Sequence, residues 1–199
     1  MTARPIRIAV LSSVFPSACQ PTLGLFVRER MRRVAQTEQV TVIAPVAWFP
    51  GLGLLRRWRP DYRPQPPRVE QQEGLTVHHP RFLSLPRFLR VLDGLSEGLS
   101  VAWTLWRLGG RRRFDLVDAH FVQPDGVAAR VASALVGLPY TITLRGQLPW
   151  LKRTRGRRYL ASWAMLGARR VFSVSGALKR DAEGFGIAPA KVDVMPNGV

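Results

Sequence analysis

At 199 residues and 46% hydrophobic content, the chain is long and apolar enough to bury the core of one domain, which argues against a disordered protein. Its single cysteine, Cys19, excludes an internal disulfide, and no group of cysteines and histidines has the spacing of a zinc site. The formal charge of +17 favours anionic partners such as nucleic acid, an anionic membrane or phosphorylated substrates, unless the coding bias of the source explains the excess of arginine.

Targeting signals are not indicated. The first apolar run, residues 6–14, is interrupted by Arg7 and soon meets Pro16, whereas a secretory signal needs a longer apolar core and a cleavage site. No run approaches the roughly 20 apolar residues needed to cross a bilayer. We therefore expect a cytoplasmic protein.

The chain begins with a strand, a helix and a second strand. Residues 6–13 form a compact β-rich run, residues 24–36 carry apolar side chains at helical spacing, and residues 39–45 form another apolar run that ends at Pro45. This order predicts a βαβ unit whose two strands are parallel and whose crossover is right-handed.

A proline-rich region then interrupts the pattern. Residues 48–73 are predicted to be a loop, residues 75–82 a strand, and residues 87 to about 108 a helix with one apolar stripe.

After the basic segment 109–113, strands and helices alternate again. The expected strands are 115–121, 139–146, 169–175 and 192–196, and the expected helices are 124–137, 157–167 and 176–186. Repeated alternation with continuously apolar strands predicts an α/β fold: a Rossmann-like, doubly wound, mainly parallel sheet with helices on both faces. We expect one domain over residues 1–199.

In such a sheet, ligands bind beyond the carboxyl ends of the strands. The residues expected there are polar, basic and rich in glycine, as in a pocket for a phosphorylated ligand: 12–24, 120–126, 145–147 and 175–176. The loop after the first strand lacks G-x-G-x-x-G, and the second strand ends without the acidic residue that would hold a ribose, so a dinucleotide enzyme is disfavoured. Neither a P-loop nor a G-x-S-x-G elbow is present.

Five segments in order instead resemble the amino-terminal domain of a family 4 glycosyltransferase of the GT-B fold. They are PTLGLFVRERMRRVA with VTVIAP, DLVDAHFVQPDG, TITLRG, VFSVSGALKRD and KVDVMPNGV. In that family a segment like MPNGV leads into a second Rossmann-like domain, which carries most of the nucleotide-sugar site, including two glutamates seven residues apart. Those glutamates are not in this sequence. The resemblance thus implies an amino-terminal domain that would not transfer sugar usefully alone.

The implied activity of the whole enzyme is transfer of a sugar from a nucleotide-diphosphate sugar to an acceptor, with retention of configuration. The acceptor would be a sugar or a lipid-linked polysaccharide precursor. The family generally needs no essential metal, and we expect no cofactor. Electrostatic support of the departing diphosphate would then supply much of the rate enhancement.

The resemblance also suggests site residues. His120, at the end of a strand, would face the donor sugar and act in catalysis, although a lone histidine is often structural. Gly24 would let backbone amides approach a phosphate or the acceptor, or would serve only the turn. Arg145 and Gly146 stand where many members have His-Gly, and a guanidinium there suits an acceptor phosphate. Many members have an aspartate shortly after this pair, whereas this chain has Gln147. The resemblance therefore does not identify the acceptor.

Three further residues are expected to contact substrate. Ser175 and Lys179 match a serine-x-x-x-lysine pattern one helical turn apart, and Lys179 is either a phosphate contact or a solvated side chain. Asn197 would lie at the hinge of the interdomain cleft. For Asp125 we expect only a cap on the following helix or a complement to its dipole. Phe26 and Val27 are expected to pack their helix.

The sequence is compatible with two kinds of partner besides small substrates. Residues 48–59, WFPGLGLLRRWR, combine tryptophan, leucine and arginine as peripheral membrane segments do, and a disordered loop without lipid contact is the alternative. A non-enzymatic polyanion-binding or membrane-binding module is the alternative function. Because the arginines are scattered and no nucleic-acid motif is present, nucleic acid is not expected as a partner.

Overall fold

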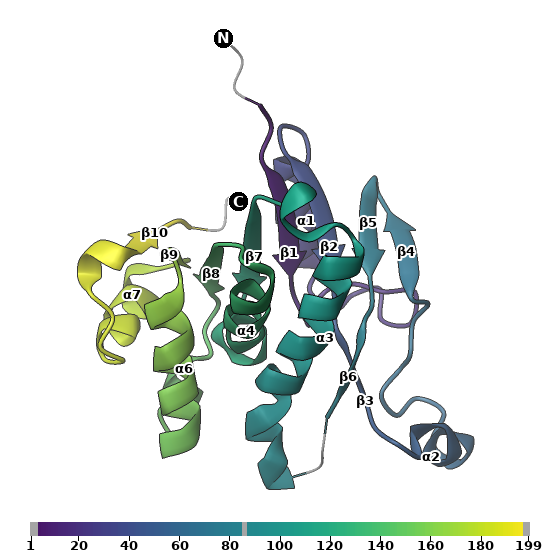
Figure 1. Cartoon of the computed structure of the whole chain (residues 1–199). Coiled ribbons are helices and arrows are strands. Elements are labelled where there is room, and N and C mark those ends of the chain that lie inside the picture. Colours follow the sequence, from purple (N-terminus) through teal and green to yellow (C-terminus); the bar gives the residue numbers. More distant parts are fainter. Residues whose placement is uncertain (1–3, 85–86, 197–199) are drawn as a thin grey trace.

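A mainly parallel sheet forms the centre of the protein. The computed structural model describes residues 4–84 and 87–196, and within them eight strands pair in the order β10-β9-β8-β7-β1-β2-β5-β4 (Figure 1). The strands are β1 (Arg7–Leu11), β2 (Gln39–Ile43), β4 (Val69–Gln72), β5 (Leu75–His78), β7 (Leu116–His120), β8 (Tyr140–Leu144), β9 (Arg170–Ser173) and β10 (Val192–Val194). Every pair is parallel except β4 with β5, which confirms the predicted α/β sheet.

The register places the carboxyl ends of the central strands together. Strand β1 lies between β2 and β7, and Leu11 is opposite both Ile43 and Ala119. On β8, Thr143 is opposite His120. Since these strands run in one direction, the segments that follow them lie at one edge of the sheet, here called the carboxyl edge.

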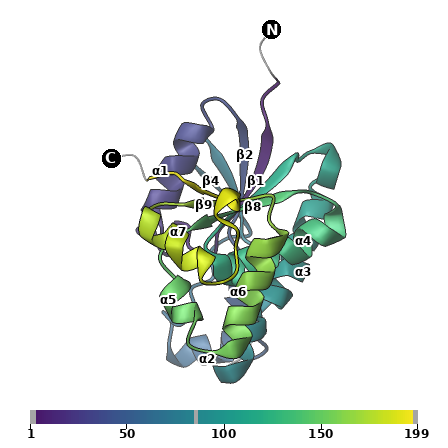
Figure 2. The same cartoon turned by 90° about the vertical axis from the view of Figure 1, so that its left-hand side faces the viewer.

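Helices cover both faces of the sheet. They are α1 (Leu25–Val34), α2 (Leu52–Trp58), α3 (Asp93–Arg107), α4 (Val127–Val136), α5 (Leu148–Leu151), α6 (Arg155–Gly167) and α7 (Gly176–Glu183). The two views place α3, α4 and α6 on one face and α1 on the other (Figures 1 and 2). Helices α3 and α4 pack closely because Gly98 has no side chain. A Cβ at this position would lie only 2.6 Å from the Cβ of Val131.

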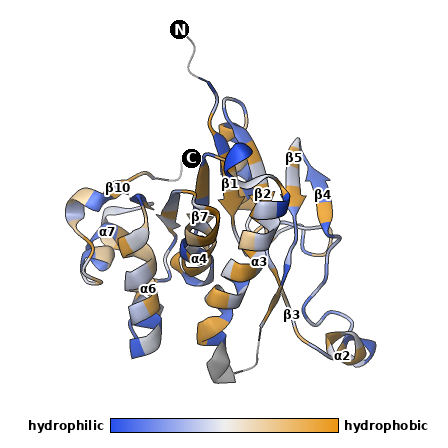
Figure 3. Cartoon of the chain, in the orientation of Figure 1, coloured by the Kyte–Doolittle hydropathy of each residue, from blue (hydrophilic) through white to orange (hydrophobic). Residues whose placement is uncertain are grey.

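The core has one apolar cluster on each face. On β1, Ala9 and Leu11 belong to the larger cluster, which α3, α4 and α6 cover, while Val10 belongs to the smaller cluster with Val27 and Met31 of α1. Alternate residues of one strand thus serve opposite faces, which explains why the strands are apolar throughout. Helix α3 by contrast alternates hydrophobic and hydrophilic bands (Figure 3).

The prediction of a loop over residues 48–73 was wrong in two places. Helix α2 begins after Gly51, whose φ of 88° sets the turn, and it is anchored by the buried side chain of Leu52. Strand β4 continues the sheet as a hairpin with β5. Irregular backbone remains between these two elements, over residues 59–68, where four prolines remove backbone donors.

The expected strand 75–82 is divided at His79 and Pro80. Strand β5 belongs to the main sheet, whereas β6 (Arg81–Leu83) pairs with β3 (Val46–Trp48) in a separate two-stranded sheet. Pro80 has no N–H for a ladder, and its carbonyl accepts from the amide of Val46 instead.

Helix boundaries also differ from the expected ones. The expected helix 124–137 begins as α4 at Val127, because residues 122–126 form a wider π-type turn. The expected helix at 87 starts as a 3-10 segment and becomes α3 at Asp93. Helix α6 starts two residues before 157, and the short α5 was not anticipated.

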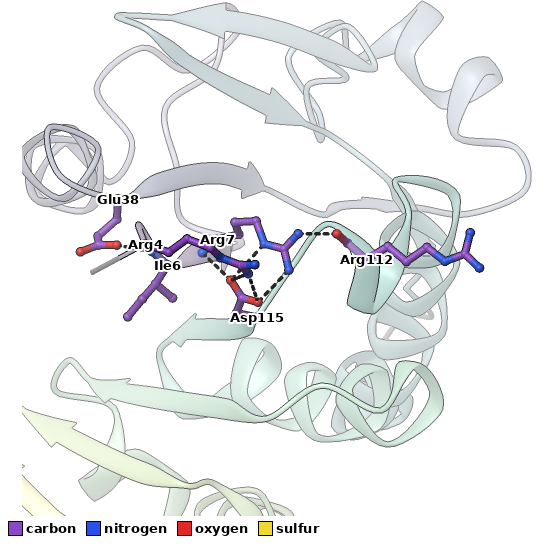
Figure 4. A network of polar contacts seen from close by, with 6 residues as sticks. All are labelled: Arg4, Ile6, Arg7, Glu38, Arg112 and Asp115. Atoms are coloured by element: carbon purple, nitrogen blue, oxygen red, sulfur yellow. Dashed lines mark hydrogen bonds and ion pairs between the residues drawn. The ribbon is translucent and has the colours of Figure 1, made fainter. Parts of the chain in front are cut away.

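At the opposite edge of the sheet, Asp115 joins the starts of β1 and β7. Its Oδ1 accepts from Nη2 of Arg7 at 2.7 Å, its Oδ2 accepts from Nε and the backbone amide of Arg7 at 3.0 Å each, and Arg4 donates to the same carboxylate (Figure 4). The Arg7 side chain holds the pKa of Asp115 well below its ordinary value. The contact joins two segments that are far apart in sequence at the edge opposite the carboxyl edge, so it contributes to the stability of the sheet.

Candidate functional site

His120 is the last residue of β7 and is fully buried at the carboxyl edge. Nε of Arg145, which follows β8, donates to Nδ1 of His120 at 3.2 Å. The other ring nitrogen, Nε2, lies 3.3 Å from Oδ2 of Asp118. An Nδ1 that accepts from a guanidinium carries no proton, so this geometry holds His120 as the neutral tautomer protonated at Nε2.

The electrostatics of the group agree with a neutral histidine. Burial lowers the pKa of His120, Asp118 opposes that shift, and the cations Arg145 and Arg30 reinforce it. Burial also lowers the pKa of Arg145, to about 10, with Arg30 adding to the effect. For Asp118 burial acts to raise the pKa, but the contacts with His120 and Thr141 outweigh it and the pKa is lowered.

Asp118 and Arg30 were not identified from the sequence. Asp118 stands two residues before His120, so both side chains lie on the same face of β7, and Thr141 Oγ1 donates to its Oδ1 at 2.7 Å. That spacing was the available signal. Arg30 comes from α1, and only the packing of α1 over the sheet brings its charge near the group.

Phe26 also belongs to this group. Its ring lies 4.9 Å from the guanidinium carbon of Arg145 and makes an edge contact with Phe121 at 6.3 Å between centroids. The side chain is 46% exposed, so the prediction that Phe26 packs its helix was wrong, whereas Val27 is fully buried as expected. Arg145 is therefore held between an aromatic ring and an imidazole.

The backbone beside His120 is strained. Phe121 has φ 78° and ψ 156°, a region that residues with a side chain seldom adopt. Its amide donates to the carbonyl of Thr143 at 2.9 Å, which keeps β7 paired with β8 through the distortion. Strain of this kind is concentrated at functional sites, so the end of β7 is a candidate for one.

Gly24 begins α1 with φ 70°, and its role is at least in part steric. A Cβ at this position would lie 2.2 Å from the carbonyl oxygen of Val14. The first helix thus starts in direct contact with the loop that follows β1, and only glycine permits the approach. The sequence left two explanations for Gly24, a turn or a ligand contact. The positive φ and the close approach to Val14 support the turn.

Asp125 does not cap α4. Its Oδ1 accepts from the backbone amide of Ser13 at 3.0 Å, which ties the loop after β1 to the turn after β7. Asp125 is fully buried together with Glu97 of α3. Burial raises the pKa of Asp125 to about 7, and burial beside Asp125 raises that of Glu97 well above its ordinary value, so the pair retains a proton near neutral pH.

The remaining predicted site residues are less closely grouped. Ser175 caps α7, since its side chain accepts from the amide of Leu178 at 3.3 Å. Lys179 is half-buried one turn later, and within the described residues nothing ties its ammonium to the His120 group. Gly146 follows Arg145 with φ 89°, as a tight turn requires. Asn197 lies outside the described residues.

Chemically, the group offers guanidinium donors and a neutral imidazole rather than a nucleophile. A sugar hydroxyl can reach Nδ1 of His120 only after Arg145 moves away from it. Within residues 4–84 and 87–196, no group of three or more metal-binding side chains comes together. In the same described part of the chain, no helix combines the length and hydrophobicity needed to span a bilayer.

The fold and the polar carboxyl edge together define a Rossmann-like α/β domain of the kind that forms half of a GT-B enzyme. Residues 23–198 match the glycosyl transferase 4-like domain, and the chain therefore belongs to that family. This membership confirms the resemblance that the five sequence segments indicated.

Known proteins agree with this assignment. Over 145 residues the chain is 28% identical to TuaC of Bacillus subtilis (strain 168), which is named as a teichuronic acid biosynthesis glycosyltransferase; the match covers 71% of this chain and 36% of TuaC. Among solved structures, HepE of Anabaena, in complex with UDP and glucose, has a TM-score of 0.61 at 17% identity, covering 98% of this chain and 45% of HepE.

Other structures show the same fold with different activities. The lipopolysaccharide outer core galactosyltransferase WaaB has a TM-score of 0.52 at 13% identity, with 96% of this chain and 46% of WaaB covered. The UDP-N-acetylglucosamine 2-epimerase from Rickettsia bellii has a TM-score of 0.57 at 8% identity, covering 96% of this chain and 44% of the epimerase. The chain thus spans less than half the length of these relatives.

Proposed function

We propose that this chain is the acceptor-side, amino-terminal half of a GT-B glycosyltransferase, and that a carboxy-terminal domain supplies most of the nucleotide-sugar site. The whole enzyme would transfer a sugar from a nucleotide-diphosphate sugar to a polysaccharide precursor or lipid-linked acceptor, with retention. Family membership supports the reaction class, and the length relative to TuaC and HepE supports the division into two domains.

The observation that carries the proposal is the group formed by Arg145, His120 and Phe26 at the carboxyl edge. Arg145 is the proposed contact for a phosphate oxygen, because its guanidinium is oriented by the imidazole and the ring. His120 is the proposed hydrogen-bonding partner of the donor sugar once Arg145 turns toward the phosphate. Gly24, Gly146, Ser175, Lys179 and Asn197 are proposed to line the same cleft, without a metal or cofactor.

The test is a transfer assay on the intact protein. UDP-glucose is the first donor to try because HepE is described in complex with it. We expect UDP release coupled to a glycosylated product whose anomeric configuration, read by NMR, matches the donor. His120→Ala should slow transfer at least about tenfold, the value of one hydrogen bond to a charged or polar group.

Three results would count against parts of the proposal. An inverted anomer would remove retention, and unchanged turnover in His120→Ala would remove His120 from the site. Interconversion of UDP-sugars without transfer would favour the epimerase-like alternative that the shared fold allows. The non-enzymatic polyanion-binding module would regain support only if no nucleotide-sugar reaction is found.

Contact with an anionic membrane is the second part of the proposal. On α2, Leu54 and Trp58 are one helical turn apart and 63% and 84% exposed, and Arg57 is exposed between them. The helix lies at one corner of the molecule, away from α4 and α6 (Figure 1). A lipid-linked acceptor would be reached at the inner face of the membrane in this arrangement.

Vesicle sedimentation tests this contact. The intact protein should sediment with anionic vesicles more than with neutral ones, and Leu54→Glu with Trp58→Glu should reduce the bound fraction several-fold. The control is Leu135→Glu, an exposed apolar side chain on α4. Equal binding to both vesicle types, or an equal loss in the control, would remove the membrane contact.

A further inference from the structure

Two cavities open near the carboxyl edge and meet at Arg63. One, of about 440 Å³, lies along the loop after β1, and the other, of about 370 Å³, lies between β3, the start of α3 and the α5–α6 segment. Arg63 and Ala47 line both. The second cavity is here called the arginine pocket. Gln123, three residues after His120, is one of its lining residues, whereas neither His120 nor Arg145 lines it.

The arginine pocket has an excess of positive charge. Arg63, Arg90 and Arg157 line it, and Asp93 is the one carboxylate among its described lining residues. Asp93 offsets part of this charge, because it interacts electrostatically with Arg63 and Arg90, and its Oδ2 also accepts from the hydroxyl of Ser84 at 3.0 Å. Three guanidinium groups against one carboxylate leave a field that favours an anion in the cavity.

Two of these guanidinium groups are held in place by aromatic rings. Arg157 lies over the ring of Trp150 at 4.1 Å, and Arg63 lies 5.4 Å from the ring of Phe49 and 5.9 Å from that of Tyr62. Ring contacts orient a guanidinium without neutralising it, unlike a carboxylate. The backbone of Arg63 has φ 48°, a left-handed conformation that is uncommon for a residue with a side chain.

Gln123 adds a polar group that lacks a donor. Its side chain is 8% exposed, and its Nε2 donates to the carbonyl of Val91 at 3.3 Å. Its Oε1 is buried and accepts no hydrogen bond from the described residues. A buried acceptor without a donor is unfavourable, so a donating hydroxyl of a ligand at this position would stabilise the complex.

We propose that the arginine pocket binds an anionic sugar unit of the acceptor. Arg63 and Arg157, with Arg90 at the rim, would bind its carboxylate or phosphate, and Gln123 Oε1 would accept from one of its hydroxyls. Identifying the ligand as the acceptor rests on the proposed glycosyltransferase function. Recognition of an anionic sugar by the pocket does not rest on that function. The binding proposal and the proposed function can therefore fail separately.

Binding of matched probes to the intact protein tests the pocket. The probes are methyl β-glucuronide for the carboxylate, glucose 1-phosphate for the phosphate, methyl β-glucoside as the neutral sugar and inorganic phosphate as the bare anion. Calorimetry at constant ionic strength should show at least one anionic sugar binding tenfold or more tightly than the glucoside. Whichever of the two binds identifies the anionic group.

Variants then locate the site. Arg63→Gln and Arg157→Gln should each weaken the preferred anionic sugar about tenfold, and Gln123→Leu should weaken that sugar but not inorganic phosphate. Arg155→Gln is the matched control, because Arg155 is exposed on α6 two residues before Arg157 and does not line the pocket. It should bind like the wild type.

Each other outcome overturns the proposal. A neutral glucoside that binds as tightly as the anionic sugars removes the role of the arginines, and this comparison needs no variant. If Arg155→Gln loses as much binding as Arg157→Gln, the probes respond to the overall positive charge and not to the arginine pocket. Inorganic phosphate that binds as tightly as glucose 1-phosphate, with no effect of Gln123→Leu, means an adventitious ion only. Transfer to a neutral acceptor would leave the glycosyltransferase function standing while this inference fails.

Discussion

Nε of Arg145 donates to Nδ1 of His120 at 3.2 Å, so the acceptor nitrogen of the imidazole is hydrogen-bonded to a cationic side chain. The charge of Arg145 is one of the causes that lower the pKa of His120. Replacing Arg145 by Gln removes that cation, and we expect the pKa of His120 to rise. Proton NMR of the histidine ring signals over a pH titration measures the change.

The other two histidines provide the reference for this titration. His78 and His79 owe their lowered pKa values first to burial, and Arg145 is not among the causes for either. Their titrations should be the same in the wild type and in Arg145→Gln. A His120 titration that does not move would mean that Arg145 is not coupled to the ring in solution.

Gly24→Ala should destabilise the protein by about 2 kcal/mol or more. A left-handed backbone costs an alanine roughly 1–2 kcal/mol, and here the new Cβ would also collide with the carbonyl oxygen of Val14. The control is Gly74→Ala, because Gly74 has φ 83° but a Cβ there meets nothing within 4 Å. Urea unfolding of both variants separates strain from collision, and equal losses would show that the contact with Val14 carries no cost.

The alternation of apolar strands and helices predicted the sheet because buried parallel strands are apolar on both faces. That signal is local, so it located β1, β2, β7 and β8 within one or two residues. It could not locate β4, whose sequence VEQQ is polar and which is a strand only because β5 offers an edge to pair with. Helix α2 was hidden by the glycines and prolines around it.

The site divides in the same way. That His120 and Arg145 lie close together could be predicted, because both stand at the carboxyl ends of apolar strands and the fold places the ends of parallel strands together. Arg63 could not, since it lies 57 residues before His120 in a segment without periodicity, and only the folded chain brings it to the arginine pocket. The contact of Glu97 with Asp125 likewise depends on the packing of α3 against the turn 122–126 that precedes α4.

Burial of Glu97 beside Asp125 predicts stability that falls as pH rises. Both carboxyls have pKa values raised in the folded protein, Asp125 to about 7, so the native state binds more protons than the unfolded chain above the ordinary carboxyl range. The linked stability is therefore present in acid and is lost as pH rises toward and through about 7. A tenfold change in the proton affinity of one carboxyl between the folded and unfolded chains corresponds to about 1.4 kcal/mol.

Glu97→Gln tests this dependence because the amide keeps the shape and removes one titrating group. From pH 5 to 8 the wild type should lose at least about 1 kcal/mol more stability than the variant, as measured by urea unfolding at each pH. Glu183→Gln on α7 removes a carboxylate outside the pair and should follow the wild type. Parallel curves for Glu97→Gln and the wild type would show that the pair does not hold an extra proton.

Asp115→Asn should act in the opposite pH direction. Because Arg7 lowers the pKa of Asp115 in the folded protein, the stability that this contact contributes is present above the ordinary carboxyl pKa and is lost as pH falls below it. We expect the variant to melt at a lower temperature than the wild type at pH 6, and the gap to narrow toward pH 3. Asp193→Asn is the control, since Asp193 is exposed and lies 4.0 Å from Arg170. If the gap at pH 3 is as large as at pH 6, the ionised form of Asp115 is not what joins β1 to β7, and the hydrogen bonds alone hold that edge together.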